Sequence, residues 1–236
     1  MKRIITTSLC IISLLFCACN DHIYAPALYK SDIAYQYKPM SSDSVKNANY
    51  VSGAISIGSG VNQQDNVLIG HASFSRANTF QNFNVAYGGY GFFGNYQNTS
   101  IPNYQPGYFT NKYLSGIGIR GSANVYTPSG RTDLRLLGIE ASYSKEFGAY
   151  AGFREYAQSL PGFYTNANTG LLTVGLTSEI IWHNQRDLNT QYGYRLFIGS
   201  VFGNQNLYNS NDPNGFYNTT TDNRDYCISG AFFLQS

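Results

Sequence analysis

Residues 170–183 read GLLTVGLTSEIIWH, and this stretch decides the fold because its side chains alternate between two kinds. Leu172, Leu176 and Ile180 fall on one face of an extended chain, and Thr177 and Glu179 fall on the other. Alternation with a period of two is typical of a β-strand whose faces meet different surroundings. The stretch is also longer than the roughly 9 to 11 residues that a strand needs to cross a membrane.

Comparable runs, rich in glycine or aromatic residues, follow one another from Tyr50 onward. The eight runs are 50–58, 67–76, 83–94, 113–126, 132–144, 170–183, 190–203 and 225–235. Run 132–144 is less regular, because strict alternation puts Arg135 on the same face as Leu137, so we expect a bulge or a protruding strand there. The pattern predicts an all-β domain at 50–236: an eight-stranded antiparallel up-and-down β-barrel.

The composition indicates which side of this barrel faces lipid. Only 12% of the 236 residues are charged and 16% are aromatic, whereas an ordinary soluble domain has about 25% charged residues. The net charge of +2 provides no basic field for nucleic acid. A soluble lipocalin-like barrel that binds an apolar ligand needs a charged outer wall, and the polar faces here carry mainly Gly, Ser, Thr and Asn. A transmembrane barrel is therefore favoured, with the soluble barrel as an alternative.

Four charged side chains lie on the predicted polar faces: Arg120, Glu140, Glu179 and Arg195. Buried charges are tolerated when they neutralise one another, so we expect a paired network inside the barrel. Eight strands leave interior room only for side chains. A conducting pore is therefore not expected.

The connections between the runs alternate in length. Segments 77–82, 127–131 and 184–189 are short, and segments 95–112, 145–169 and 204–224 are long. Only the first connection, 59–66, does not follow this alternation. Short turns at one rim and long loops at the other resemble the small eight-stranded outer-membrane barrels.

Each long loop contains a similar motif of proline, glycine and two aromatic residues. The aromatic pairs are Tyr108 and Phe109, Phe163 and Tyr164, and Phe216 and Tyr217. We expect them to form an aromatic girdle at headgroup depth; the alternative is that they bind a glycan or protein partner. One short helix is predicted over 146–160, ended by Pro161 and Gly162.

The N-terminus resembles a bacterial lipoprotein signal. A basic start at Lys2 and Arg3 precedes an apolar run, which ends in LFCAC at residues 15–19. The resemblance implies cleavage after residue 18 and a lipid such as palmitate on Cys19; an ordinary cleaved signal peptide is the alternative. Loss of Lys2 and Arg3 leaves 13 basic and 13 acidic side chains. Residues 19–49 are then expected to be a lipidated polar tether.

Taken together, the lipobox-like segment and the strand pattern resemble outer-membrane lipoproteins of Bacteroidota type. The resemblance implies an outer-membrane location, a lipid anchor at Cys19, membrane lipid as a partner, and a structural or surface-binding role at the cell surface.

A catalytic alternative depends on His71 and Ser73, which share one strand face. An outer-membrane lipid deacylase family carries a similar His-x-Ser with an acid nearby, which implies Glu140 or Glu179 in that role. Two polar residues at the rim or in the lumen are the simpler interpretation, and a non-catalytic role is favoured. No CxxC, HExxH, GxGxxG or Walker motif is present, and we predict no cofactor and no metal.

Overall fold

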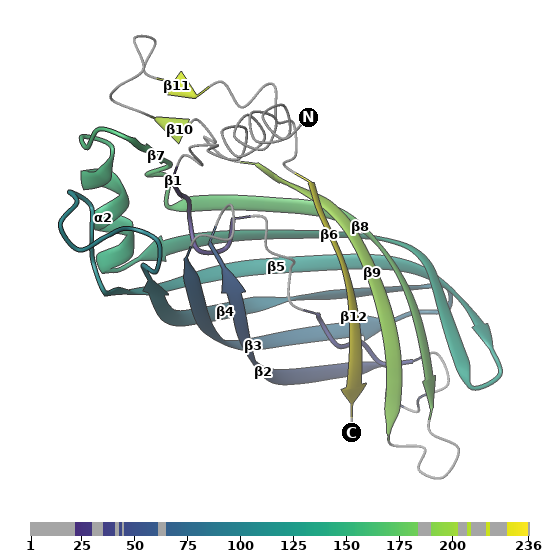
Figure 1. Cartoon of the computed structure of the whole chain (residues 1–236). Coiled ribbons are helices and arrows are strands. Elements are labelled where there is room, and N and C mark those ends of the chain that lie inside the picture. The colour runs from purple at the N-terminus through teal and green to yellow at the C-terminus, as the bar shows by residue number, and fades with distance from the viewer. Residues whose placement is uncertain are drawn as a thin grey trace, which may run out of the picture.

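The structure is a computed structural model that describes residues 22–29, 35–40, 43, 45–60, 65–183, 190–202, 207–208, 216–217 and 226–235. Eight long antiparallel strands form a single sheet that curls into a barrel-like wall (Figure 1). The predicted fold class, an all-β antiparallel barrel with one short helix, is confirmed. The predicted signal peptide 1–18 and the lipidation residue Cys19 lie outside the described residues.

Each long strand pairs with its neighbours in chain order, which is the up-and-down arrangement. The strands are β2 (Asn47–Ser59), β3 (Asn66–Thr79), β4 (Phe83–Gln97), β5 (Asn111–Ser129), β6 (Thr132–Phe147), β8 (Gly170–His183), β9 (Gln191–Phe202) and β12 (Tyr226–Gln235). Every predicted run overlaps one of them, and run 170–183 coincides with β8.

The strand connections define two rims. At the turn rim, β3 joins β4 through residues 80–82, β5 joins β6 through 130–131, and β8 joins β9 through 184–190. At the loop rim, the connections are 60–65, 98–110, 148–169 and 203–225.

The irregularity expected in run 132–144 is a β-bulge. The register of β6 against β8 shifts between Arg135 and Gly138. Leu136 and Leu137 are consecutive, and both are exposed, whereas Arg135 and Glu140 on either side are buried. The bulge therefore corrects strict alternation and turns Arg135 to the inner face, away from Leu137.

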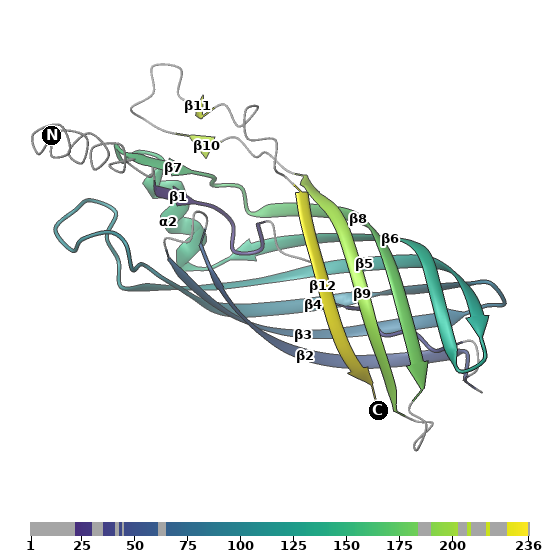
Figure 2. The ribbon, with the colours of Figure 1, turned by 45° about the vertical axis from the view of Figure 1, so that its right-hand side comes forward.

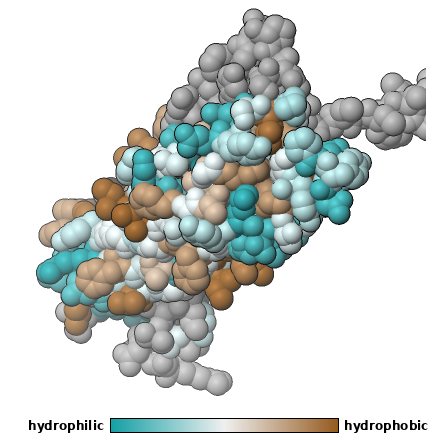
Figure 3. All heavy atoms as spheres, turned by 90° about the vertical axis from the view of Figure 1, so that its left-hand side faces the viewer, coloured by the Kyte–Doolittle hydropathy of each residue, from teal (hydrophilic) through white to brown (hydrophobic). Residues whose placement is uncertain are grey.

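The two faces of the sheet differ sharply in polarity. On β5, Ile117 and Ile119 are exposed on the outer face, while Arg120 and Asn124 are buried on the inner face. Among the described side chains of the eight strands, the charged residues at outward positions are Arg76, near the end of β3, and Lys145, near the end of β6. Hydrophobic side chains are visible on the molecular surface (Figure 3).

The sheet is open along one seam, where full closure was expected. Strands β2 and β12 are its two edges, and no register pair joins them in the described part of the chain. Both views show them apart (Figure 1, Figure 2). A closed eight-stranded barrel encloses side chains alone, whereas this curl also encloses a segment of backbone, described below.

Short elements gather at the loop rim (Figure 2). Strands β1 (His22–Tyr24), β7 (Phe163–Thr165), β10 (Leu207–Tyr208) and β11 (Phe216–Tyr217) form a small second sheet. Helix α2 (Ala149–Ala157) lies within the predicted range 146–160, and Gly162 follows it with a φ of 85°, a conformation that suits glycine.

Within the described residues, no helix is long and apolar enough to span a bilayer.

Candidate functional site

The described part of residues 20–49 does not form a free tether. We call residues 22–29, 35–40 and 43 the threaded segment, because they pack against the inner side of the curl. Lys38 and Met40 are completely buried, as is Tyr24. The expectation of a solvated tether is corrected here because the run from Ile23 to Tyr29 has only apolar or aromatic side chains, and because Lys38 finds buried carboxylates.

A buried ionic network joins the threaded segment to the inner wall. Lys38 Nζ lies 3.0 Å from Glu179 Oε1 and 3.7 Å from Glu140 Oε1. Arg135 Nη1 lies 2.8 Å from Glu179 Oε2, and Arg195 Nη2 lies 2.6 Å from Glu140 Oε2. Breaking one member of such a network leaves an uncompensated buried charge, which is strongly destabilising. The network therefore couples β6, β8 and β9 to the threaded segment.

Three of the four predicted lumen residues, Glu140, Glu179 and Arg195, belong to this network. Arg120 lies on the same inner face, where its Nη2 donates a hydrogen bond to Ser73 Oγ at 2.8 Å. Sequence reasoning missed two members, Lys38 and Arg135. A count over the true inner face, with the bulge included, could have identified Arg135.

The candidate catalytic residues are held by other partners. Ser73 Oγ shares a hydrogen bond of 2.6 Å with Ser52 Oγ and accepts one from Arg120. Glu140 is bound to Arg195, and the His71 ring packs 6.2 Å from the ring of Phe92. No hydrogen bond in the described part of the chain joins His71 to Ser73 or Glu140, so the acid, base and nucleophile are not assembled as a triad.

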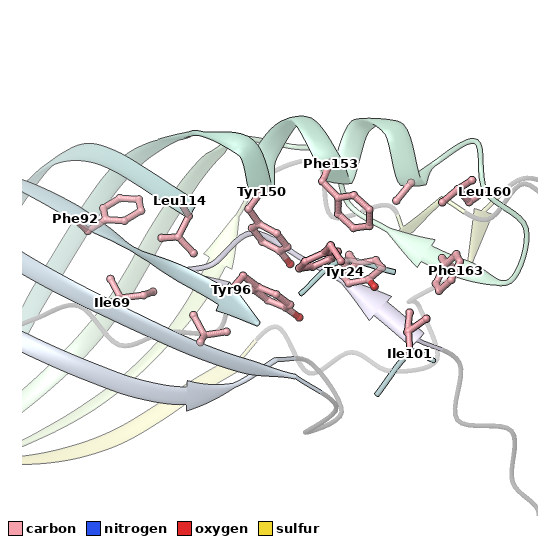
Figure 4. Packing of buried hydrophobic residues seen from close by; sticks show 13 residues of the cluster. Tyr24, Ile69, Phe92, Tyr96, Ile101, Leu114, Tyr150, Phe153, Leu160 and Phe163 are labelled. Carbon is pink, nitrogen blue, oxygen red and sulfur yellow. The ribbon is translucent and has the colours of Figure 1, made fainter. Parts of the chain in front are cut away.

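At the loop rim the threaded segment ends in a cluster of aromatic side chains, which we call the aromatic cap. Tyr24 from β1 contacts the ring of Phe153 at 5.0 Å in an edge-to-face arrangement, and Figure 4 shows it between the side chains of β4, α2 and β7. Tyr96 and Tyr150 stack at 4.1 Å. Such pairs contribute beyond their buried area, by about 0.5 to 1.5 kcal/mol each. The cap therefore fixes β1 to the loops.

The loop aromatics do not behave as one girdle. Phe109 and Phe163 are buried in the aromatic cap, each 7% exposed. Tyr108 is 41% exposed and Tyr164 is half-buried. For Phe216 and Tyr217 the structure describes the backbone pairing of β11 with β10. The girdle or ligand-stacking expectation is thus corrected for Phe109 and Phe163, because Tyr24 supplies an internal partner for both.

Polar contacts complete the cap. Arg154 Nη1 lies 2.6 Å from Glu146 Oε1, and the other oxygen of Glu146 accepts a 2.8 Å hydrogen bond from the backbone N–H of Ala27. The Tyr150 hydroxyl donates to the carbonyl oxygen of Ala25 at 2.9 Å. These bonds tie the backbone of the threaded segment to α2 and β6.

Two phenols in the cap remain neutral. Burial raises the pKa of Tyr24 well above its ordinary value, and the neighbouring Asp65 carboxylate raises it further. Burial likewise raises the pKa of Tyr150. Asp65 is itself bound to His22, with Nε2 and Oδ2 separated by 2.9 Å.

A cavity of about 480 Å³ lies between the threaded segment and the edge strands. Its wall is mainly apolar, with Arg195 and His71 as basic side chains. The lining residues are Ala27, Leu28, Tyr29, Tyr35, Ala54, Ser56, Ile57, Gly58, Ser59, Val67, Ile69, His71, Arg195 and Ala231. The described residues contain no group of three or more His, Cys, Asp or Glu that could hold a metal ion.

No protein family, curated protein or solved structure matches this chain. The function is therefore argued from the geometry of the inner and outer faces.

Proposed function

We propose that this protein is an outer-membrane β-barrel lipoprotein with a structural or surface-binding role, anchored through Cys19, and that it does not conduct. The lipobox-like segment at residues 15–19 supports the anchor, and the alternation of short turns with long loops supports an outer-membrane orientation.

The observation that carries the proposal is the distribution of charge between the faces. Outward positions hold large apolar side chains such as Ile117, Ile119 and Phe232, exposed by 63%, 67% and 83%. Arg76 and Lys145 stand near strand ends, whereas Arg135, Glu140 and Glu179 are buried inside. A wall in contact with hydrocarbon requires this arrangement, and a wall in contact with water requires the reverse.

The contents of the curl support the absence of conduction. The threaded segment occupies the interior, and its Lys38 is bound to two wall carboxylates. An eight-stranded wall has no further width for an aqueous channel. The long loops at the loop rim are the surface available to a glycan or protein partner.

An arginine on the outer wall tests the proposal. In a bilayer, Ile119→Arg should lower the free energy of unfolding by roughly 2 to 4 kcal/mol, the cost of an arginine near the membrane midplane. On a water-facing wall the same exposed change should stay within about 0.5 kcal/mol. The measurement is urea unfolding after refolding into phosphatidylcholine vesicles, followed by the fluorescence of Trp182, the single tryptophan.

Asn103→Arg, in an exposed loop, is the matched control and should leave the unfolding free energy unchanged. A chain that folds without lipid or detergent and tolerates Ile119→Arg would contradict the proposal and favour a soluble barrel.

A further inference from the structure

The threaded segment is fixed at the loop rim at its beginning. Strand β1 pairs in parallel with β7, with His22 opposite Phe163 and Tyr24 opposite Thr165. The backbone N–H of Asn166 donates to the carbonyl oxygen of Tyr24 at 2.9 Å. The first described residues of the chain therefore lie among the long loops (Figure 2).

The same segment is fixed at the turn rim at its end. Thr79, the last residue of β3, donates its hydroxyl to the carbonyl oxygen of Pro39 at 2.8 Å. Gln191, the first residue of β9, donates to Asp43 Oδ2 at 3.0 Å. Asp43 also lies 3.1 Å from His183 Nε2, at the end of β8. The chain has thus passed from the loop rim to the turn rim before β2 starts at Asn47.

The middle of the passage is held in place by charge. Arg135 Nη2 donates to the carbonyl oxygens of Lys38 and Pro39, at 3.1 and 3.3 Å, while Lys38 binds Glu179. Withdrawing the segment would strip Glu179 of one cation and Arg135 of two acceptors, all inside a buried space. Such losses are strongly unfavourable, so the threaded arrangement is the stable one.

This topology sets the side of the membrane on which the chain begins. Cys19 is three residues before His22, and an extended chain spans at most about 3.6 Å per residue, so Cys19 lies within roughly 11 Å of the first residue of β1. We propose, resting on the proposed function, that the lipid on Cys19 inserts into the leaflet at the loop rim, which is the cell-surface leaflet. The barrel is then folded around its own N-terminal segment.

Three insertions of a biotin-acceptor peptide into the full chain test this inference. One follows Asp21, one follows Asn103 in a long loop, and one follows Gly130 in a short turn; biotin ligase is added to intact and to permeabilised cells. The expected result is that the first two tags are biotinylated on intact cells, whereas the Gly130 tag reacts only after permeabilisation.

If the loop tag reacts on intact cells while the Asp21 and Gly130 tags both require permeabilisation, the inference is overturned and the proposed function stands. If the loop and turn tags react alike, the proposed function fails and the inference fails with it.

A disulfide test keeps the inference falsifiable if an insertion prevents folding. In a Cys227→Ser background, Ile23→Cys with Tyr164→Cys should cross-link under mild oxidation in the detergent-extracted protein, because these residues are paired between β1 and β7. Ile23→Cys with Asn82→Cys, at the turn rim, should not. Cross-linking of the second pair in place of the first would overturn the threaded topology.

Discussion

The two ends of the threaded segment are held by different forces. At the loop rim, Tyr24 is surrounded by aromatic rings and its backbone joins β7. Toward the turn rim, Lys38 is held by Glu179 and by Glu140, and its carbonyl oxygen accepts from Arg135. The first end gains its stability from burial, and the second depends on charge balance in a space without water.

The difference predicts unequal responses to mutation and to pH. An aromatic cluster loses the transfer energy of what is removed and the contacts around the resulting cavity. An ionic network that loses one member also leaves the remaining charges unpaired, although replacing a whole network by apolar groups is often tolerated. The predictions that follow use this contrast.

The largest effect is expected in the ionic network. Glu179→Gln leaves Lys38 and Arg135 without their shared carboxylate, and should lower the free energy of unfolding by about 3 to 5 kcal/mol. Urea unfolding in detergent, followed by Trp182 fluorescence, measures it. Glu155→Gln, on the exposed side of α2, is the control. A loss from Glu179→Gln no larger than the control would show that the network does not hold the segment.

The next effect belongs to the aromatic cap. Tyr24→Ala removes the ring between Phe153 and Phe163 and should cost about 3 kcal/mol in the same unfolding assay. Tyr24→Phe, which keeps the ring and loses the hydroxyl contact with Asn98, should cost about 1 kcal/mol. Tyr108→Ala, with a half-exposed ring, is the matched control. Equal costs for Tyr24→Phe and Tyr24→Ala would mean that hydrogen bonding, and not burial, dominates the cap.

The smallest effect is expected from alkaline pH. Because the folded pKa of Tyr24 lies above the ordinary value near 10, its contribution to stability is fully present below about pH 10 and is lost as the pH rises toward the folded pKa. Stability measured between pH 8 and pH 11.5 should fall at the upper end less steeply in Tyr24→Phe than in the wild type. Parallel curves for the two proteins would exclude a role for the Tyr24 hydroxyl.

Much of the fold was predictable because period-two alternation is a local signal. The face assignment on β5 holds from Ile117 to Val125, and all eight runs overlap the observed strands. The bulge limited the accuracy on β6, since one extra residue reverses every face assignment before it. This is why Arg135 was not assigned to the inner face.

The threaded segment could not be predicted in the same way, because its partners are far away in the chain. Lys38 and Glu179 are separated by 141 positions, and four lumen charges that balance one another do not indicate a missing cation. Two signals were nevertheless present. The run from Ile23 to Tyr29 is too apolar for a solvated tether, and Gln36, Lys38 and Met40 are buried at every second position.

The central claim is that the outer wall of the sheet itself holds the protein in the membrane. The direct measurement replaces the signal with an ordinarily cleaved signal peptide, adds Cys19→Ala, and fractionates the cells after an alkaline carbonate wash. The account predicts that the unlipidated protein stays in the membrane fraction and needs detergent for release, because apolar strand faces such as those of β5 and β9 contact hydrocarbon. Recovery of a folded, monomeric protein from the aqueous fraction would contradict it.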